Sequence, residues 1–369
     1  MSTKNKHKFI FVGDAVLSSK PVLSAELKSL FDSADVLSCN FEAPLTGYGS
    51  PIQKTGPLVS QSVDAPRLLL DMGFNLFSLA NNHIYDYGDL GLQNTIAAFP
   101  KEMIIGVGGE DLAYAAQIRV LDDISYGFMA FGENGYGALN GDRDFGHAWV
   151  NAEQTEQAIS YWKSKVDVLI IQVHAGVELL DVPIPEWRSR YRALLHAGAD
   201  VIVGHHPHVV QAVETYEGKL ICYSLGNFYF DYPSNHPQWN TGGLLTLEFD
   251  HKNLVHHQVQ LLNKKAEQVS LMEREQSDVE LHRLQEKLMS ADYTEYVNQF
   301  AIKEWELHHA AYYAKPFNGL ARYQFKSLLK QVKRTVFNRK IDYNMLWHNL
   351  FIESNKWLVE RAIRLKIKK

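Results

Sequence analysis

Short hydrophobic runs alternate with segments of helical periodicity over roughly the first 230 residues of the chain. The runs are rich in Val, Ile, Leu and Phe and are typical of buried strands, whereas the segments between them place apolar residues three and four positions apart. This alternation predicts an α/β protein in which helices pack on sheets. We expect strands at 8–14, 35–42, 75–83, 116–123, 124–133, 166–174, 199–206 and 219–228, and helices at 22–34, 64–74, 88–100, 155–165 and 184–198.

The pattern changes near residue 265. Residues 241–250 and 253–262 flank a His-Lys pair and alternate with period two, which predicts a hairpin that ends the first part of the chain. Beyond residue 266 the pattern is helical and rich in Glu, Lys, Leu and aromatic residues. We therefore expect one domain at 1–265 and a helical, basic domain at 266–369.

Charge is distributed unevenly along the chain. Residues 315–369 hold 14 Lys and Arg against 3 Asp and Glu, although the whole chain carries −5. Within this stretch, 325–340 places apolar residues at helical spacing among Lys and Arg, which is typical of a helix lying on an anionic membrane surface. The alternative is a helical domain packed on the core with a solvated basic face. The acidic remainder lacks the basic groove that nucleic acid demands, so no nucleic-acid partner is expected.

The compartment is suggested by three weaker signals. No segment reaches the roughly 18 apolar residues needed to cross a bilayer, and the first apolar run is too short for a signal peptide. Cys39 and Cys222 lie far apart after hydrophobic stretches, which predicts two reduced, buried thiols. We expect a cytoplasmic protein, peripheral on the inner face of the membrane if the basic segment binds there.

Polar residues follow the ends of six expected strands. A single histidine at a strand end is more often a hydrogen-bonded structural residue, but six coincident endings predict a functional site. Ligands of α/β sheets bind outside the carboxyl ends of the strands, so these side chains are expected to meet. The endings are Gly13-Asp14, Asn40-Phe41-Glu42, Asn81-Asn82-His83, His174-Ala175-Gly176-Val177-Glu178, Gly204-His205-His206-Pro207-His208 and Gly226-Asn227.

The mixture of donors predicts a metal site. Carboxylate, amide and imidazole groups without thiolate suit Mn, Fe or Zn better than a structural zinc site of cysteines. More donors are present than one tetrahedral ion accepts, which predicts two ions, or one ion with an open face. His206 and His208, separated by a proline, can face the same side of a turn, and His205 then points into the wall or acts as a supporting donor.

Seven segments of the chain resemble the CapA family of capsule and poly-γ-glutamate synthesis proteins. That family is similar to the calcineurin-like metallophosphatases, so the resemblance implies a four-layer αββα sandwich with a two-metal centre, here followed by a C-terminal helical region. The resemblance covers roughly residues 8 to 262. The segments are, in order, GDAVLS, NFEAPLT, SLANNHIYDYGDLGLQNTI, IGVGG, HAGVE, GADVIVGHHPHVVQAVE and YSLGNFYFD.

The resemblance also implies roles for the strand-end residues. His83 resembles the histidine that protonates a leaving group, and we group it with His205 as a candidate catalytic residue. The first metallophosphatase motif, Asp-x-His, is absent because Ala15 and Val16 follow Asp14, so one metal position is weakened or filled by Glu42 or Glu178. The expected metal ligands are Asp14, Glu42, Asn82, His174, His206 and His208, and the expected substrate-binding residues are Asn40, Glu178 and Asn227.

These residues together favour hydrolysis. A divalent cation lowers the pKa of water towards 7, and a neighbouring imidazole can donate a proton to the departing atom. We therefore expect a metal-dependent hydrolase, first of all a phosphoesterase, acting on a cell-envelope or capsule polymer or its precursor. Two alternatives stay open: a hydrolase of γ-glutamyl amides, and a non-catalytic component of a membrane complex that synthesises capsule or poly-γ-glutamate.

Overall fold

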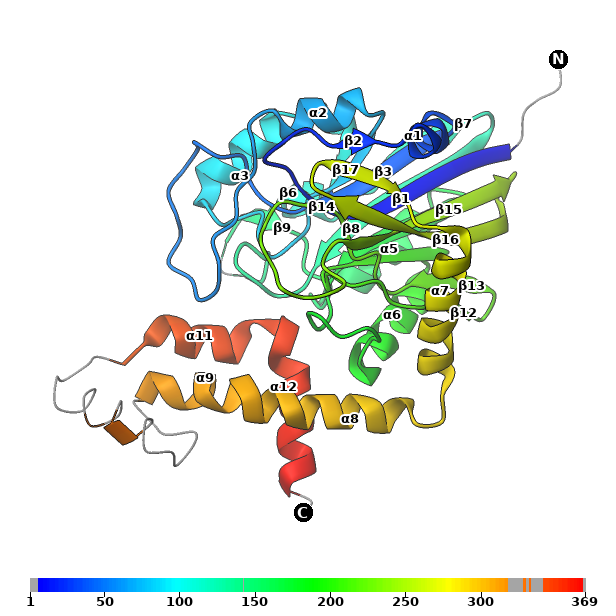
Figure 1. The fold of residues 1–369 in the computed structure, drawn as a ribbon. Helices are drawn as coiled ribbons and strands as arrows, with labels where there is room; N and C mark the ends of the chain where they lie inside the picture. The colour runs from blue at the N-terminus through cyan, green and yellow to red at the C-terminus, as the bar shows by residue number, and fades with distance from the viewer. Residues whose placement is uncertain (1–5, 142, 318–327, 330–331, 333–340, 368–369) are drawn as a thin grey trace.

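Two β-sheets lie face to face between outer layers of helices (Figure 1). The computed structural model describes residues 6–141, 143–317, 328–329, 332 and 341–367. Within these residues the larger sheet has nine strands and the smaller has six. A two-stranded ribbon of β6 (Val107–Gly109) and β9 (Phe145–His147) lies beside them.

The nine-stranded sheet runs in the order β2-β17-β16-β15-β1-β3-β4-β5, and β14 also pairs with β1. β1 pairs in parallel with β3 and with β14, and β4 and β5 continue the parallel order beyond β3. On the other side β15 pairs antiparallel with β1 and forms the expected antiparallel hairpin with β16. The strands are β1 (Lys6–Val16), β2 (Val22–Leu23), β3 (Val36–Phe41), β4 (Leu76–Ser78), β5 (Ile104–Ile105), β14 (Asn227–Phe230), β15 (Thr241–Asp250), β16 (Asn253–Lys265) and β17 (Gln268–Leu271).

The six-stranded sheet runs in the order β12-β13-β11-β10-β8-β7. Its four central strands are parallel, so their carboxyl ends meet at one edge, and an antiparallel strand closes each side. The strands are β7 (Gln117–Leu121), β8 (Ile124–Gly132), β10 (Val168–His174), β11 (Val201–His205), β12 (Val213–Tyr216) and β13 (Lys219–Cys222).

Side-chain alternation along β1 explains the layers. Phe9 and Phe11 pack into the core between the two sheets, whereas Ile10 and Val12 pack under helices on the outer face of the larger sheet. Strands buried on both faces need no polar positions, which is why they read as continuous apolar runs. The expected four-layer αββα sandwich is confirmed. Its main helices are α1 (Ala25–Asp32), α2 (Ala65–Asp71) and α3 (Gly88–Ala97) on one side and α5 (Thr155–Lys163) and α6 (Pro185–Ala197) on the other, with the short α4 (Glu110–Ala113) and η1 (Lys101–Met103) between strands.

The expected C-terminal helical region is also present. Figure 1 shows α8 and α9 running beneath the sandwich, with α12 crossing α8. Leu288, Val297 and Leu358 share one buried core with the outer face of the smaller sheet. The larger sheet continues past residue 265, through β17 to Leu271. The division of the chain into two domains at residue 265 stays a prediction. The helices are α7 (Arg274–Met289), α8 (Tyr293–Glu304), η2 (Trp305–His309), α9 (Ala310–Ala314), η3 (Lys315–Phe317), α11 (Tyr343–Phe351) and α12 (Glu353–Ile367).

Residues 219–228, expected as one strand, form two strands in different sheets. β13 belongs to the smaller sheet, and after Gly226, whose φ is 57°, β14 pairs with β1 of the larger sheet. A Cβ on Gly13 would lie 1.9 Å from the Gly226 carbonyl oxygen, so the two backbones can approach only because Gly13 has no side chain. This crossing places Asn227 directly beside Asp14.

Two further expectations concern the membrane and the cysteines. Within the described part of the chain, no helix combines the length and the apolar character that crossing a membrane requires. Most of the basic segment 325–340 lies outside the described residues, so membrane contact through it stays a prediction. Cys39 and Cys222 are free and buried, and burial raises the pKa of the Cys222 thiol to about 12.

A buried carboxylate joins α6 to the smaller sheet. Glu214 on β12 accepts hydrogen bonds from Arg188 and Arg192 of α6 and from the Tyr223 hydroxyl. Burial alone would raise the pKa of Glu214, but these hydrogen bonds lower it to about 2. A lowered pKa means that the ionised form stabilises the fold above the ordinary pKa of 4.5, and that this stabilisation is lost as the pH falls towards 2.

A fall in the pKa of Glu214 from 4.5 to about 2 corresponds to about 3 kcal/mol, and solvent screening at the partly exposed Arg192 reduces this. We therefore expect Glu214→Gln to lower the free energy of unfolding by about 2 kcal/mol at neutral pH. The difference from the wild-type chain should shrink as the pH falls below about 4.5. Urea unfolding at neutral pH and near pH 3.5 measures both effects. Glu217→Gln is the matched control, because this carboxylate is exposed on the same hairpin. An equal loss at both pH values would contradict the assignment.

Candidate metal centre

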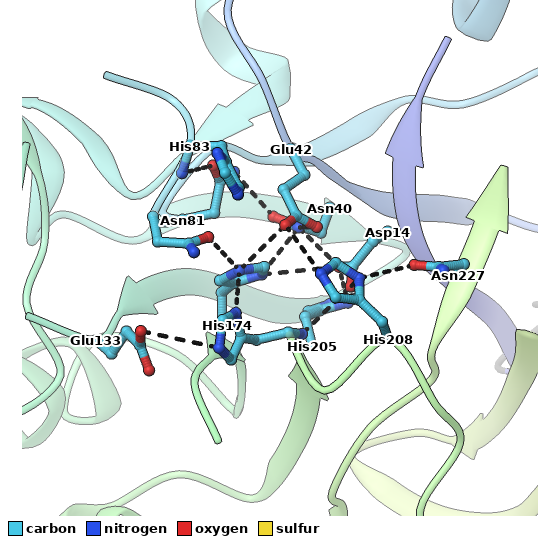
Figure 2. A network of polar contacts seen from close by, with 12 residues as sticks. Asp14, Asn40, Glu42, Asn81, His83, Glu133, His174, His205, His208 and Asn227 are labelled. Carbon is cyan, nitrogen blue, oxygen red and sulfur yellow. Dashed lines mark hydrogen bonds and ion pairs between the residues drawn. The ribbon is translucent and has the colours of Figure 1, made fainter. Parts of the chain in front are cut away.

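The polar strand ends converge at one edge of the sandwich (Figure 2). In the larger sheet Asp14 on β1 is in register with Asn40 on β3 and with Asn227 on β14. In the smaller sheet His174 on β10 is in register with His205 on β11. Parallel pairing within each sheet therefore brings these side chains together, as the sequence predicts.

The turn after β11 directs two imidazoles inward. His206 and His208 have positive φ angles of 96° and 57°. Such backbone conformations cost about 1–3 kcal/mol each for residues other than glycine and persist where the surroundings demand them. The two ring centroids lie 6.0 Å apart, and both imidazoles are buried. This arrangement agrees with the expectation that the two rings can face one side of the turn, which stays a prediction.

The Glu42 carboxylate lies between the imidazoles of His174 and His208. Its Oε1 atom is 3.6 Å from His174 Nε2 and 3.8 Å from His208 Nε2. Two sets of ligand atoms lie within 4.8 Å of one another: Glu42 with His174 and His206, and Glu42 with Asp14 and His208. Glu42 belongs to both sets. Glu178, the other carboxylate considered for a missing ligand, belongs to neither.

Buried polar atoms without partners show that these residues fit a cation. Within the described residues, Glu42 Oε1 and His206 Nε2 are buried and have no hydrogen-bond partner. Such atoms are costly in a protein interior unless an ion or water satisfies them. Burial, together with the charge of Asp14, raises the pKa of Glu42 well above its usual range. A divalent cation beside Glu42 would remove both costs.

Asp14 is already held as a carboxylate. Burial alone would raise its pKa, but the hydrogen bond and charge of His174, with the charges of His205 and His208, hold the pKa of Asp14 well below its usual range. The backbone N–H of His206 also donates to Asp14 Oδ2 at 3.3 Å. This carboxylate is therefore available to a metal ion.

Two predicted site residues support the candidate ligands from behind. Asn40 Nδ2 donates to Asp14 Oδ1 at 2.7 Å, and Asn227 Oδ1 lies 2.9 Å from His208 Nδ1. A hydrogen bond at Nδ1 leaves Nε2 as the metal-binding nitrogen, which is the usual arrangement for metal-ligating histidines. The geometry thus favours a supporting role for Asn40 and Asn227 over the substrate contact expected from sequence.

His205 is also placed behind the ligands. Its Nε2 atom lies 3.1 Å from Gln172 Oε1, and its Nδ1 atom lies 3.5 Å from Asp14 Oδ1. It is fully buried and is not among the residues that line the adjoining cavity. Of the three roles expected for His205, the geometry favours the supporting donor over the catalytic residue.

His83 faces the cavity and is oriented by a carboxylate that sequence reasoning missed. Its Nδ1 atom lies 2.7 Å from Asp86 Oδ2, and Asp86 also forms a buried ion pair with Lys54. Burial lowers the pKa of His83, while the hydrogen bond to Asp86 raises it. The signal for Asp86 was its spacing three residues after His83, whereas nothing in the sequence distinguishes Lys54.

Asn82 and Glu133 lie beside the candidate ligands His174 and His206. Asn82 Oδ1 lies 2.9 Å from His174 Nε2. Glu133, which sequence reasoning missed, is buried with Oε1 3.8 Å from His206 Nε2. It follows Gly132 at the end of β8, so the rule that found the other strand ends applies to it as well.

A cavity of about 210 Å³ opens beside the centre. Asn82, His83, Glu178 and His208 line it, so the position of Glu178 agrees with a substrate contact, which stays a prediction. Among the aromatic residues of nearby loops, Tyr136, Tyr232 and Trp239 also line it. The cavity is therefore lined by both the candidate ligand His208 and the candidate proton donor His83.

Comparison with known proteins identifies relatives for the first two thirds of the chain. A family model described as "Bacterial capsule synthesis protein PGA_cap" matches residues 5–232. "PGA biosynthesis protein CapA" of Bacillus subtilis is 33% identical over 211 residues, which cover 56% of either chain. "Capsule biosynthesis protein CapA" of Bacillus anthracis is 32% identical over 216 residues, covering 54% of this chain and 51% of that one. The chain matches about half the length of these curated relatives.

Solved structures give a more distant likeness. A putative 5'-nucleotidase from Staphylococcus aureus aligns with a TM-score of 0.45 and 14% sequence identity. The alignment covers 76% of this chain and 58% of that one.

Proposed function

The chain belongs to the PGA_cap family of bacterial capsule synthesis proteins, and we propose that it acts as a metal-dependent phosphoester hydrolase. Its proposed substrate is a cell-envelope or capsule polymer or a precursor of one. The observation that carries this proposal is the pair of ligand sets that share Glu42, whose Oε1 atom is buried between two imidazoles without a hydrogen-bond partner among the described residues.

We propose that two divalent ions, of Mn, Fe or Zn, bind here. Glu42, His174 and His206 would hold one, and Glu42, Asp14 and His208 the other. Imidazole and carboxylate donors suit these metals. Asn82 beside His174, and Glu133 beside His206, lie where each would complete the first set. When bound, such ions lower the pKa of water towards 7 and polarise the phosphoryl group.

The chain's own residues would supply the proton. Asp86 accepts a hydrogen bond from His83 Nδ1–H and favours the imidazolium form, in which Nε2 carries the proton that the departing oxygen takes. Asp86 is itself held by Lys54 and by the Val59 backbone N–H, so the imidazole is fixed in orientation. His174, His206 and Asp14 are buried, so bulk solvent does not compete for these side chains.

A substrate panel tests the proposal. The full chain is purified without chelator, its metal content is measured, and it is then stripped and reloaded with Mn(II). Cleavage of p-nitrophenyl phosphate or bis(p-nitrophenyl) phosphate supports the phosphoesterase. Cleavage of γ-glutamyl p-nitroanilide alone supports an amide hydrolase instead.

A component of a synthesis complex without catalysis is the second candidate. It is favoured by the printed names of the Bacillus relatives, which speak of biosynthesis and not of hydrolysis. A chain that turns over neither esters nor the γ-glutamyl amide supports this candidate. Contact with an anionic membrane through the basic C-terminal region is part of it, and flotation with anionic liposomes tests that contact.

Removal of the metal should lower thermal stability. A ligand present at a thousand times its Kd stabilises the fold by about 4 kcal/mol, so we expect chelation to lower Tm by roughly 5–10 °C. Differential scanning fluorimetry with chelator, and again after addition of Mn(II), measures the shift. The Asp14→Asn, His208→Ala double variant is the control and should show a much smaller response. A wild-type Tm that changes neither with chelator nor with Mn(II) would contradict metal binding.

A further inference from the structure

The C-terminal helices reach the reaction cavity. His348 on α11, Asn355 on α12 and Ile352 between them line the same cavity as His83 and His208. All three lie outside residues 5–232, which match the family model. The part of the chain without a family match therefore contributes to the wall of the proposed active site.

The start of α12 is fixed to the sandwich by a buried carboxylate. Glu353 accepts hydrogen bonds from the Asn134 backbone N–H at 2.7 Å, from Trp149 Nε1 at 2.9 Å and from Asn151 Nδ2 at 3.1 Å. Its own N–H donates to the Asn134 carbonyl oxygen at 3.1 Å. Asn134 directly follows Glu133, so α12 is held against the loop that reaches the metal centre.

A ring contact fixes α11 in the same way. The Trp347 and Tyr136 ring centroids lie 5.0 Å apart, and the Tyr136 hydroxyl accepts a hydrogen bond from the Thr55 backbone N–H at 3.1 Å. Lys54 Nζ lies 5.3 Å from the centroid of the Tyr136 ring. Three segments distant in sequence thus meet at this wall, and the helix that bears His348 is held in place.

The wall is polar and the space is small. Within the described residues, His348 Nδ1 is buried and has no hydrogen-bond partner. Asn355 is partly buried and adds an amide. The cavity of about 210 Å³ is smaller than the roughly 300–1,000 Å³ of sites for drug-sized ligands. It has room for one monomer-sized group with hydrogen-bonding atoms.

We propose that His348 and Asn355 bind the leaving group of the substrate, and that this group is a single polar alcohol of monomer size. The inference rests on the proposed hydrolase function, because His83 would protonate the departing oxygen in this cavity. It sharpens that function: the substrate is a phosphomonoester of a polyol or hydroxy acid, a precursor and not the finished polymer.

The test compares polar and aromatic esters in the full, Mn(II)-loaded chain. Glycerol 3-phosphate, O-phosphoserine and glucose 1-phosphate represent polar leaving groups, and p-nitrophenyl phosphate lacks their hydroxyl and amine hydrogen bonds. His348→Ala and Asn355→Ala should each raise KM for the best polar ester about tenfold, the effect of losing one hydrogen bond. KM for p-nitrophenyl phosphate should change less than about threefold. His348→Gln keeps a donor and should restore part of the loss.

Binding provides a readout independent of turnover. Calorimetry with 3,4-dihydroxybutyl phosphonate, a non-hydrolysable analogue of glycerol 3-phosphate, should show an increase in Kd of about tenfold in both alanine variants. Inorganic phosphate should bind all variants alike. His308→Ala is the matched control, since His308 is an exposed histidine of η2.

The outcomes separate the two proposals. A wild-type chain that cleaves no ester refutes the hydrolase and this inference with it. A wild-type chain that cleaves polar esters, with KM and Kd unchanged in both alanine variants, overturns only the role of the C-terminal wall. Cleavage of p-nitrophenyl phosphate without any polar monoester overturns the assigned leaving group.

Discussion

Glu42→Gln should remove bound metal and lower kcat on p-nitrophenyl phosphate by about a thousandfold, which corresponds to about 4 kcal/mol of transition-state stabilisation. Glu42 is the group common to both ligand sets, and its Oε1 atom lies within 4 Å of His174 Nε2 and His208 Nε2. Glutamine preserves the shape but not the charge, so neither set keeps its anionic ligand at this position. Elemental analysis and steady-state kinetics measure the two effects.

The apo protein distinguishes loss of a ligand from loss of the fold. Burial raises the pKa of Glu42 when no cation is present, so a neutral amide should cost the metal-free fold little. We therefore expect metal-free Glu42→Gln to melt within a few degrees of the metal-free wild-type chain. Glu178→Gln is the matched control, because this carboxylate lines the cavity but belongs to neither ligand set. It should retain its metal, and a Glu42→Gln chain with full metal content would refute the shared ligand.

The sequence predicted the layers but not the path between them. Continuous apolar runs such as Phe9-Ile10-Phe11-Val12 indicated strands buried on both faces, and the helical segments between them were found. The same runs carry no information on which sheet a strand joins. The crossing at Gly226 depends on the close approach of Gly13, a contact between residues more than 200 positions apart. Periodicity within a short window cannot reveal such a contact.

The rule of strand ends found the site but did not rank its members. Asp14, Glu42 and His174 converge as predicted, because parallel strands end at one edge. Asn40 and Asn227 follow the same rule, yet each contacts a candidate ligand from behind. Whether a side chain points into the cavity or behind a ligand depends on side-chain rotamers and neighbours, which the sequence does not specify.

The sequence does not predict that the C-terminal helices line the cavity, and the reason is different. The basic, helical pattern after residue 266 was interpreted as a separate domain. Glu353, His348 and Asn355 are ordinary helix residues in that pattern, with no motif around them. Their proximity to the cavity is produced by tertiary packing of α11 and α12 on loops some 200 residues earlier. Only the fold brings them to the site.

His83→Ala should lower kcat more for esters with poor leaving groups than for esters with good ones. Loss of a general acid typically costs 10²–10⁴-fold, so we expect kcat for glycerol 3-phosphate to fall by about a hundredfold or more. The p-nitrophenolate ion departs without a proton, so kcat for p-nitrophenyl phosphate should fall less than about tenfold. Metal content should stay at the wild-type value, because His83 belongs to neither ligand set.

Asp86→Asn tests whether Asp86 orients the His83 imidazole for proton transfer. Asp86 contacts His83 Nδ1 at 2.7 Å and does not line the cavity, so it positions His83 without touching the substrate. Asparagine removes the carboxylate charge that favours the doubly protonated imidazolium, and its NH₂ group can face Nδ1 only when Nδ1 carries no proton, so the acid form of His83 is less populated. The variant should therefore repeat the preference of His83→Ala for the better leaving group, with a smaller loss. Equal losses on both esters in the two variants would mean that His83 holds the substrate or the fold, and that the departing oxygen takes its proton elsewhere.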